Sequence, residues 1–279
     1  MAIPLTERPF EAAVFDLFGT LVPEYTKAEF YGAVADAAEV LGADQAAFRA
    51  EWDRTAPARQ TGGFTDLASN LRAICDVLGL SVDDATIDRA LEARETMYRA
   101  GFHPRVGALE TLTELRSRGY PIALVSMCAP DTPARWRTLP LAPFVEVTVF
   151  SSETGLRKPD PAIYLAATDR LGVSPEACVY CGDGAYGELT GAAAVGMTPF
   201  LIRGPGHTRS RPSVPQAPAP TARPKGQRPL PPSVSRTSVG ARRSPLRRAA
   251  VAARTRPTGR SGWRAPPDLR SPRPPRADP

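Results

Sequence analysis

The chain has little that would place it in or on a membrane. No run approaches 18 consecutive apolar residues, and the start, MAIPLTERPF, has no apolar core of the length that a secretory signal needs. Cysteine is scarce, at 4 of 279 residues, which fits a reducing compartment where disulfides are rare. We therefore expect a cytoplasmic protein with no membrane association.

Two of the cysteines, Cys178 and Cys181, form a C-x-x-C pair within the stretch ACVYCGD. This apolar stretch is typical of a buried strand, in which positions three apart point to opposite faces. The sequence therefore predicts neither a disulfide nor a shared metal for this pair.

Aromatic and acidic residues are nearly absent from residues 204–279. That segment holds 17 of the 31 prolines, one Trp and no Phe or Tyr, and its net charge of +15 contrasts with −9 for residues 1–203. Such a composition cannot bury enough apolar surface to offset the entropy of ordering, so it predicts a disordered tail. Without interleaved aromatics or a recognition module, only nonspecific attraction to acidic surfaces is expected, and no specific nucleic-acid partner.

The tail has a second interpretation. Its composition changes abruptly after the letters RGPGHT and shows no helical or strand period. It is either a functional basic segment or an out-of-frame translation of GC-rich DNA. Resequencing the locus, or detecting tail peptides by mass spectrometry, decides between the two.

What the remaining sequence does contain is an alternation of short apolar runs and helical patterns. Together they predict an α/β fold, a Rossmann-like parallel sheet with helices on both faces. Asp160 followed by Pro161 is typical of a helix N-cap and first helical position. The predicted strands are 12–17, 122–126, 145–150, 177–182 and 198–203, and the predicted helices between them are 106–118, 131–138, 160–171 and 186–195.

About a hundred residues separate the first two predicted strands, far more than one crossover helix needs. Residues 24–101 carry a helical period instead, which predicts a small helical domain inserted after the first strand, with Ser81 and Asp84 as a capping box. Ligands of open α/β sheets bind beyond the carboxyl ends of the strands, so this insertion would cover the site as a cap. The predicted domains are a core of 10–22 and 102–203, a cap of 23–101 and a tail of 204–279.

Polar residues follow the predicted strands where each one ends. Asp16, Ser126 and Asp183 end strands, Glu188 comes five residues after Asp183, and Lys158 lies in the loop GLRKPDP. Because the carboxyl ends of parallel strands meet at one edge of a sheet, these side chains are expected to converge. A carboxylate can attack phosphorus, clustered carboxylates hold Mg²⁺, and a Lys and a Ser hydroxyl neutralise the transferring oxygens.

Over residues 10–203 the chain resembles the haloacid dehalogenase-like hydrolases, in the subfamily with a helical cap between its first two motifs. The resemblance depends on FDLFGTLV, ALVS, RKPDP and GDGAYGELTGAAAVGM, taken in that order. It implies a hydrolase with Mg²⁺ as cofactor. The roles that it implies are a nucleophile, Asp16; a metal-binding main-chain carbonyl, Phe18; groups that bind phosphate or orient the nucleophile, Thr20 and Ser126; a charge-stabilising cation, Lys158; and two further metal ligands, Asp183 and Glu188.

Phe18 departs from the family pattern. Phosphatases of the family usually carry an Asp two residues after the nucleophile, as a general acid and base worth roughly 10²–10⁴ in rate. A phenyl ring cannot transfer a proton. Three explanations stay open: a cap residue or water supplies the proton, the leaving group needs none, or the activity is feeble or lost.

The same departure makes dehalogenation an alternative reaction, because family dehalogenases carry a non-acidic residue at this position and attack carbon. Those enzymes work without metal and usually lack the acidic pair that Asp183 and Glu188 form here. Beside Asp16, these carboxylates would repel one another without a cation. We therefore expect a Mg²⁺-dependent phosphatase that forms an aspartyl-phosphate at Asp16 on a small phosphorylated metabolite. A haloacid dehalogenase, a phosphonate hydrolase and a non-catalytic binding protein stay as alternatives, and substrate identity and oligomeric state stay open.

Other candidates have structural interpretations. His103 is expected on the surface where the cap rejoins the core, and Trp52 and Tyr98 in the core of the cap. Arg135 and Arg137 are expected on a solvated helix face.

Overall fold

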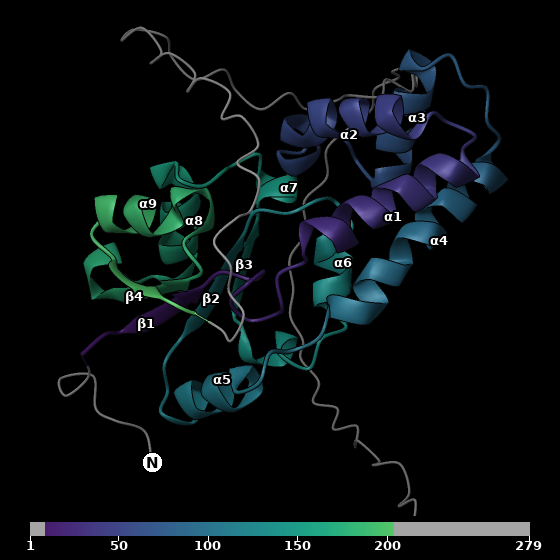
Figure 1. Ribbon diagram of the computed structural model, residues 1–279. Coiled ribbons are helices and arrows are strands. Elements are labelled where there is room, and N and C mark those ends of the chain that lie inside the picture. Colours follow the sequence, from purple (N-terminus) through teal and green to yellow (C-terminus); the bar gives the residue numbers. More distant parts are fainter. Residues whose placement is uncertain (1–8, 204–279) are drawn as a thin grey trace, which may run out of the picture. The chain divides into compact units, whose positions relative to one another are not determined.

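The computed structural model describes residues 9–203; the predicted tail, 204–279, lies outside the described residues. Five parallel strands form one sheet in the order β3-β2-β1-β4-β5. The predicted parallel α/β sheet is confirmed (Figure 1). The strands are β1 (Ala12–Phe15), β2 (Ile122–Ser126), β3 (Val147–Phe150), β4 (Cys178–Gly182) and β5 (Thr198–Leu201).

Helices cover both faces of the sheet, as predicted. Every residue of β1 and β2 is buried, the burial typical of central strands in a parallel sheet. One apolar cluster joins these strands to α5 (Ala108–Ser117), and a second joins them to α8 (Pro161–Leu171) and α9 (Glu188–Ala194). Figure 1 shows α5 on one side of the strands and α8 and α9 on the other.

Several predicted boundaries need correction. The first strand ends at Phe15 rather than at residue 17, because the carbonyl of Leu17 accepts hydrogen bonds from the amides of residues 20–22 and closes a turn. Helix α9 begins at Glu188 rather than at residue 186, because Tyr186 and Gly187 have positive φ angles of 54° and 66°. The prediction for α8 is confirmed: Asp160 caps the amide of Ala162 at 2.9 Å, and Pro161 is the first helical residue.

Short elements complete the described sheet region. They connect strands to helices without adding a layer. They are α6 (Thr132–Trp136), α7 (Ser151–Thr154) and three 3₁₀ turns, η2 (Ala142–Phe144), η3 (Pro175–Ala177) and η4 (Ala185–Gly187).

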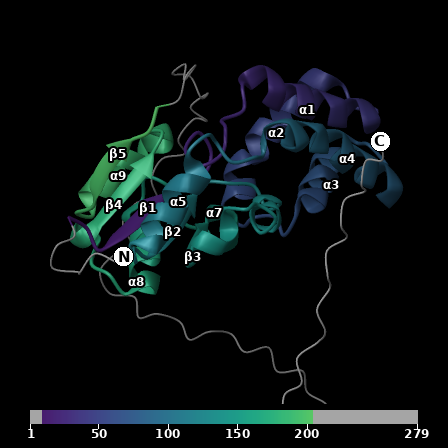
Figure 2. The same ribbon diagram turned by 90° about the horizontal axis from the view of Figure 1, so that it is seen from below.

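Five helices lie between β1 and β2 in the sequence, and we call the first four of them, α1 to α4, the helical insertion (Figure 2). They share an apolar cluster of their own that includes Phe48, Trp52 and Leu71. The predicted domain boundaries at 22/23 and 101/102 stay a prediction, since Tyr25 and Phe102 pack against clusters on both sides. The helices are α1 (Lys27–Val40), α2 (Gln45–Gln60), α3 (Leu67–Val77) and α4 (Asp84–Gly101).

The predicted capping box of Ser81 and Asp84 is wrong. Helix α4 is capped by Asp83, whose carboxylate accepts the amide of Thr86 at 2.8 Å. An N-cap side chain accepts a hydrogen bond from a backbone amide two or three residues later, which has no partner within the helix. Asp83 directly precedes the helix and has this spacing to Thr86. Among the helices of residues 9–203, none combines the length and the apolarity that a membrane crossing requires.

The four cysteines are free thiols, and the pair in β4 faces opposite sides of the sheet, as predicted. Cys178 belongs to the cluster under α8 and α9, whereas Cys181 contacts the cluster under α5. Burial raises the pKa of Cys128, Cys178 and Cys181 to about 11, and raises that of Cys75.

Slow thiol–disulfide exchange is therefore expected in the native protein. A thiol whose pKa is raised holds its proton to higher pH, so at pH 8 only about one in a thousand of those near 11 is the reactive thiolate. Ellman's reagent at pH 8 should react with none of the four at the rate of free cysteine, and with all four in denaturant. A native thiol that reacts as fast as free cysteine would contradict the burial described here.

Candidate active site

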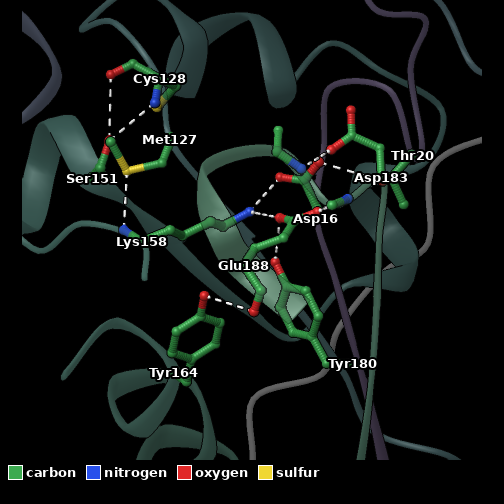
Figure 3. Close-up of polar contacts among 12 residues, drawn as sticks. Asp16, Thr20, Met127, Cys128, Ser151, Lys158, Tyr164, Tyr180, Asp183 and Glu188 are labelled. Atoms are coloured by element: carbon green, nitrogen blue, oxygen red, sulfur yellow. Dashed lines mark hydrogen bonds and ion pairs between the residues drawn. The ribbon is translucent and has the colours of Figure 1, made fainter. Parts of the chain in front are cut away.

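Three carboxylates meet where β1 and β4 end. These strands are neighbours at the point where the strand order reverses, the position at which open α/β sheets bind ligands. One oxygen from each of Asp16, Asp183 and Glu188 lies within 4.8 Å of the others, and all three side chains are buried. The convergence that strand order predicts is therefore present for these three residues (Figure 3).

Lys158 lies between two of these carboxylates. Its Nζ is 2.5 Å from Oδ1 of Asp16 and 2.6 Å from Oε2 of Glu188, and only 1% of the side chain is exposed. The loop is anchored at the same residue, because the amide of Lys158 donates to Sδ of Met127 at 3.3 Å, just beyond the end of β2. Figure 3 shows the ammonium pointing into the acidic cluster.

Two tyrosines that the sequence analysis missed hold Glu188 in place. The hydroxyl of Tyr180 donates to Oε2 at 2.8 Å, and the hydroxyl of Tyr164 donates to the Glu188 carbonyl at 3.0 Å. The amide of Gly184 donates to Oε1 at 2.8 Å. A buried tyrosine needs a partner for its hydroxyl, so Tyr180 in an otherwise apolar strand was the available signal.

Two glycines allow the backbone to approach these carboxylates. Gly19 has a φ of +77°, and a Cβ there would overlap the carboxylate of Asp183. A Cβ at Gly182 would overlap the carboxylate of Glu188. Side chains at either position would therefore push apart the acidic cluster.

The cluster carries more negative charge than Lys158 balances. Burial and the charge of Glu188 raise the pKa of Asp16 to about 7, against the opposing effect of Lys158. Burial alone would lower the pKa of Lys158, but Asp16 and Glu188 raise it overall. Burial would raise the pKa of Glu188, yet Lys158 and Tyr180 bring it below its usual value. Three buried carboxylates against one ammonium form the hard-oxygen donor set that suits a divalent cation.

The other predicted residues lie nearby in different ways. Thr20 Oγ1 donates to Oδ2 of Asp16 at 3.3 Å. Ser126 Oγ is buried at the end of β2 and has no hydrogen-bond partner among residues 9–203, so it is not joined to the acidic cluster. The ring of Phe18 lies 5.9 Å, centroid to centroid, from each of Tyr25 and Phe102.

The prediction that Arg135 lies on a solvated helix face is wrong. This residue is half-buried rather than solvated, because its guanidinium pairs with Glu95 of α4, with Nη1 2.6 Å from Oε2, and lies 3.9 Å above the Tyr98 ring. Arg137 is exposed as predicted, and His103 is exposed as predicted.

The sheet is doubly wound, a helical insertion follows its first strand, and buried carboxylates and a lysine lie at its carboxyl edge. This combination is typical of an α/β hydrolase whose site is rich in carboxylates. The family profile described as haloacid dehalogenase-like hydrolase matches residues 10–196, and the chain belongs to this family of enzymes.

Curated relatives carry two kinds of activity in their names. A glyceraldehyde 3-phosphate phosphatase of Methanopyrus kandleri is 32% identical over 127 residues, which are 45% of this chain and 54% of that enzyme. An (S)-2-haloacid dehalogenase 4A of Burkholderia cepacia is 29% identical over 202 residues, 70% of this chain and 84% of that enzyme. The chain thus spans about half the length of the phosphatase and most of the dehalogenase.

Solved structures agree on the fold. An enzyme of the same family from Bacteroides thetaiotaomicron superposes with a TM-score of 0.54 at 20% identity, covering 70% of this chain and 95% of that one. The same enzyme was also solved as a magnesium complex, which superposes with a TM-score of 0.54.

Proposed function

We propose that the chain is a cytoplasmic, Mg²⁺-dependent phosphatase that acts on a small phosphorylated metabolite through an aspartyl-phosphate at Asp16. The observation that carries the proposal is the buried cluster of Asp16, Asp183 and Glu188 with Lys158 between two of them. The phosphatase names of several relatives support the reaction class, and the free cysteines fit a reducing compartment.

In this proposal each group of the site has a task. Thr20 binds one carboxylate oxygen of Asp16 and Lys158 binds the other, so the nucleophile is held in one orientation. An Asp16 oxygen forms a bond to phosphorus while the ester bond breaks, and the leaving alkoxide takes a proton from water or from a residue of the helical insertion, because Phe18 has none to give. A water molecule then attacks the aspartyl-phosphate, which releases inorganic phosphate and restores the Asp16 carboxylate. Lys158 neutralises charge on the phosphoryl oxygens, and the unpartnered hydroxyl of Ser126 is free to donate to one of them.

The metal would be held by Asp16, Asp183, Glu188 and the carbonyl of Phe18. When bound, Mg²⁺ supplies positive charge shared between these oxygens and the substrate phosphate. The fit depends on the donor set: three carboxylates lie within 4.8 Å, and their mutual repulsion is part of what raises the pKa of Asp16 to about 7.

Dehalogenation is the second candidate, favoured by the alignment that spans 84% of a haloacid dehalogenase and by the non-acidic Phe18. Attack on carbon needs no cation. The acidic cluster favours the phosphatase, since a metal-free enzyme gains nothing from burying Asp183 and Glu188 beside its nucleophile.

A metal-dependence experiment separates the two. Hydrolysis of p-nitrophenyl phosphate should require Mg²⁺ and stop with chelator, and release of chloride from 2-chloropropionate should be absent. Asp183→Asn should lower kcat/KM by about 10²-fold or more, because a ligand worth several kcal/mol of charge stabilisation is weakened. Asparagine keeps an oxygen acceptor for the Ala185 amide, which donates to Oδ1 at 2.8 Å, so the loop is expected to stay folded.

Thermal unfolding gives a reading independent of turnover. Mg²⁺ should raise the Tm of the wild type, because the ion binds only the folded cluster, and should leave the Tm of Asp183→Asn unchanged. Chloride release without metal, or phosphatase activity indifferent to chelator, would overturn the proposal.

A further inference from the structure

A cavity lies beside the acidic cluster, between the helical insertion and the loops at the carboxyl ends of the strands. Its volume is about 140 Å³. Phe18, two residues after Asp16, and Met127, directly after Ser126, line it from the sheet side, and Trp52 and Tyr98 line it from the insertion. The cavity therefore adjoins the two chain segments that carry Asp16 and Ser126.

Two buried arginines line the same cavity. Arg59 of α2 is 3% exposed and Arg94 of α4 is 2% exposed. Their guanidinium carbons lie 3.7 Å and 4.3 Å from the centroid of the Trp52 ring. Trp52 belongs to the core of the insertion, as predicted. The two arginines that lie over its ring bring two positive charges to the same cavity. Burial and the charge of Arg94 lower the pKa of Arg59 to about 9.

Neither arginine has a carboxylate partner among residues 9–203. Nη1 of Arg59 donates only to neutral acceptors, namely the Trp52 carbonyl at 3.0 Å, Thr55 Oγ1 at 3.1 Å and Asn70 Oδ1 at 2.9 Å. Nε and Nη1 of Arg94 are buried and donate no hydrogen bond at all. A buried, unpaired guanidinium is strongly unfavourable, which makes this pair unlike Arg135 with its Glu95 partner.

One acidic group that lines the cavity, Asp53, is engaged by other residues. Asp53 accepts the hydroxyl of Tyr31 at 3.3 Å and pairs with Arg49 at 4.0 Å. The charges of Asp131 and Asp53 favour the charged form of Arg59, but among residues 9–203 the carboxylates of these two residues form no ion pair with Arg59 or Arg94. A direct carboxylate partner for the two arginines would therefore enter with a ligand.

We propose that Arg59 and Arg94 form a second anion subsite, which binds the carboxylate of a substrate whose phosphate ester lies at Asp16. The substrate class is a small phosphate monoester that also carries a carboxylate. This inference rests on the proposed phosphatase function and extends it. A planar guanidinium matches a carboxylate with two parallel hydrogen bonds, and a phosphate ester that lacks a carboxylate would leave the buried donors unpaired. Such a site is expected to reject the analogue that lacks the carboxylate.

Two three-carbon esters test the subsite. 3-Phosphoglycerate carries a carboxylate where glycerol 3-phosphate carries a hydroxymethyl group. The wild type should hydrolyse the first with a kcat/KM higher by about 10²-fold or more. Arg94→Met should reduce this preference to within about 3-fold of unity, because methionine keeps the apolar stem and removes only the donors.

Two further variants control for folding and charge. Arg99→Met makes the same change on the exposed face of α4 and should keep the preference. Arg94→Gln retains a polar group and should lose the preference as Arg94→Met does. Because Nε and Nη1 of Arg94 donate to nothing in the protein, neither Arg94 variant should unfold at a lower temperature than the wild type.

The outcomes separate the subsite from the phosphatase. Equal hydrolysis of both esters by the wild type, or a preference that survives Arg94→Met, overturns the subsite and leaves the phosphatase standing. If neither ester is hydrolysed, the proposed function fails, and calorimetric binding of 3-phosphoglycerate then tests the subsite alone. Binding that Arg94→Met weakens at least tenfold supports the subsite; absent binding, or binding that the variant does not weaken, overturns it.

Discussion

Asp16→Asn is expected to lower kcat for phosphate-ester hydrolysis by about 10⁴-fold or more, the scale of losing a catalytic nucleophile. The amide oxygen is a poor nucleophile, and asparagine has the size of aspartate, so the packing around the site is kept. Lys158 retains its ion pair with Glu188 at 2.6 Å and does not become an unpaired buried charge. Activity and folding are therefore separable in this variant.

The measurement is steady-state hydrolysis of p-nitrophenyl phosphate with saturating Mg²⁺, together with thermal unfolding of the same preparation. Asp36→Asn, the same substitution at an exposed position of α1, should keep wild-type activity. A kcat within tenfold of the wild type for Asp16→Asn would remove the aspartyl-phosphate from the mechanism and move the reaction to a water molecule activated elsewhere.

The part of the site that strand order controls could be predicted from the sequence. Parallel strands end at a common edge, so acids at the ends of β1 and β4 meet whatever the rest of the chain does. The apolar runs were long enough to locate all five strands. Their ends were less predictable, because the turn after Asp16 depends on three amides that share the Leu17 carbonyl.

The support around Glu188 could not be predicted from local patterns. Tyr164 on α8 and Tyr180 on β4 meet Glu188 only because α8 and α9 cover the same face of the sheet. The sequence predicts that residue 186 belongs to the helix, because nothing in the letters AYGEL indicates that Tyr186 has a positive φ angle.

The arginine pair was missed for a related reason. Helical period separates apolar from polar faces, and arginine counts as polar, so Arg59 and Arg94 are expected in solvent. Only the packing of α2 against α3 and α4 turns both toward Trp52. The structure shows both arginines as buried charges without a carboxylate partner in the described part of the chain, which the polar and apolar pattern of the helices does not reveal.

Phe18→Asp is expected to raise kcat/KM for an alkyl phosphate by about 10²-fold or more, the scale of adding a positioned general acid. An alkoxide is a poor leaving group, and the residue two positions after the nucleophile is where related phosphatases carry that acid. For p-nitrophenyl phosphate the gain should be much smaller, because the nitrophenolate leaves without a proton. The dependence on the leaving group is the diagnostic quantity, measured as the ratio of kcat/KM for glycerol 3-phosphate over p-nitrophenyl phosphate.

The same substitution should destabilise the fold. The ring of Phe18 is 7% exposed and lies against Tyr25 and Phe102, and loss of a buried phenyl group costs about 3 kcal/mol or more. Phe18→Asn is the matched control, since it loses the same packing and gains no acid. Its stability should fall as far as that of Phe18→Asp, and its activity on the alkyl phosphate should not rise.

Comparison of the two variants decides why the chain carries a phenyl group. A rise in Phe18→Asp alone shows that proton transfer is the missing step and that the cluster of Asp16, Lys158, Asp183 and Glu188 is otherwise competent. An equal rise in both variants would mean that the ring obstructs the substrate. No rise in either would show that another group already protonates the leaving oxygen, and would move the search for the acid to side chains that line the cavity beside Phe18.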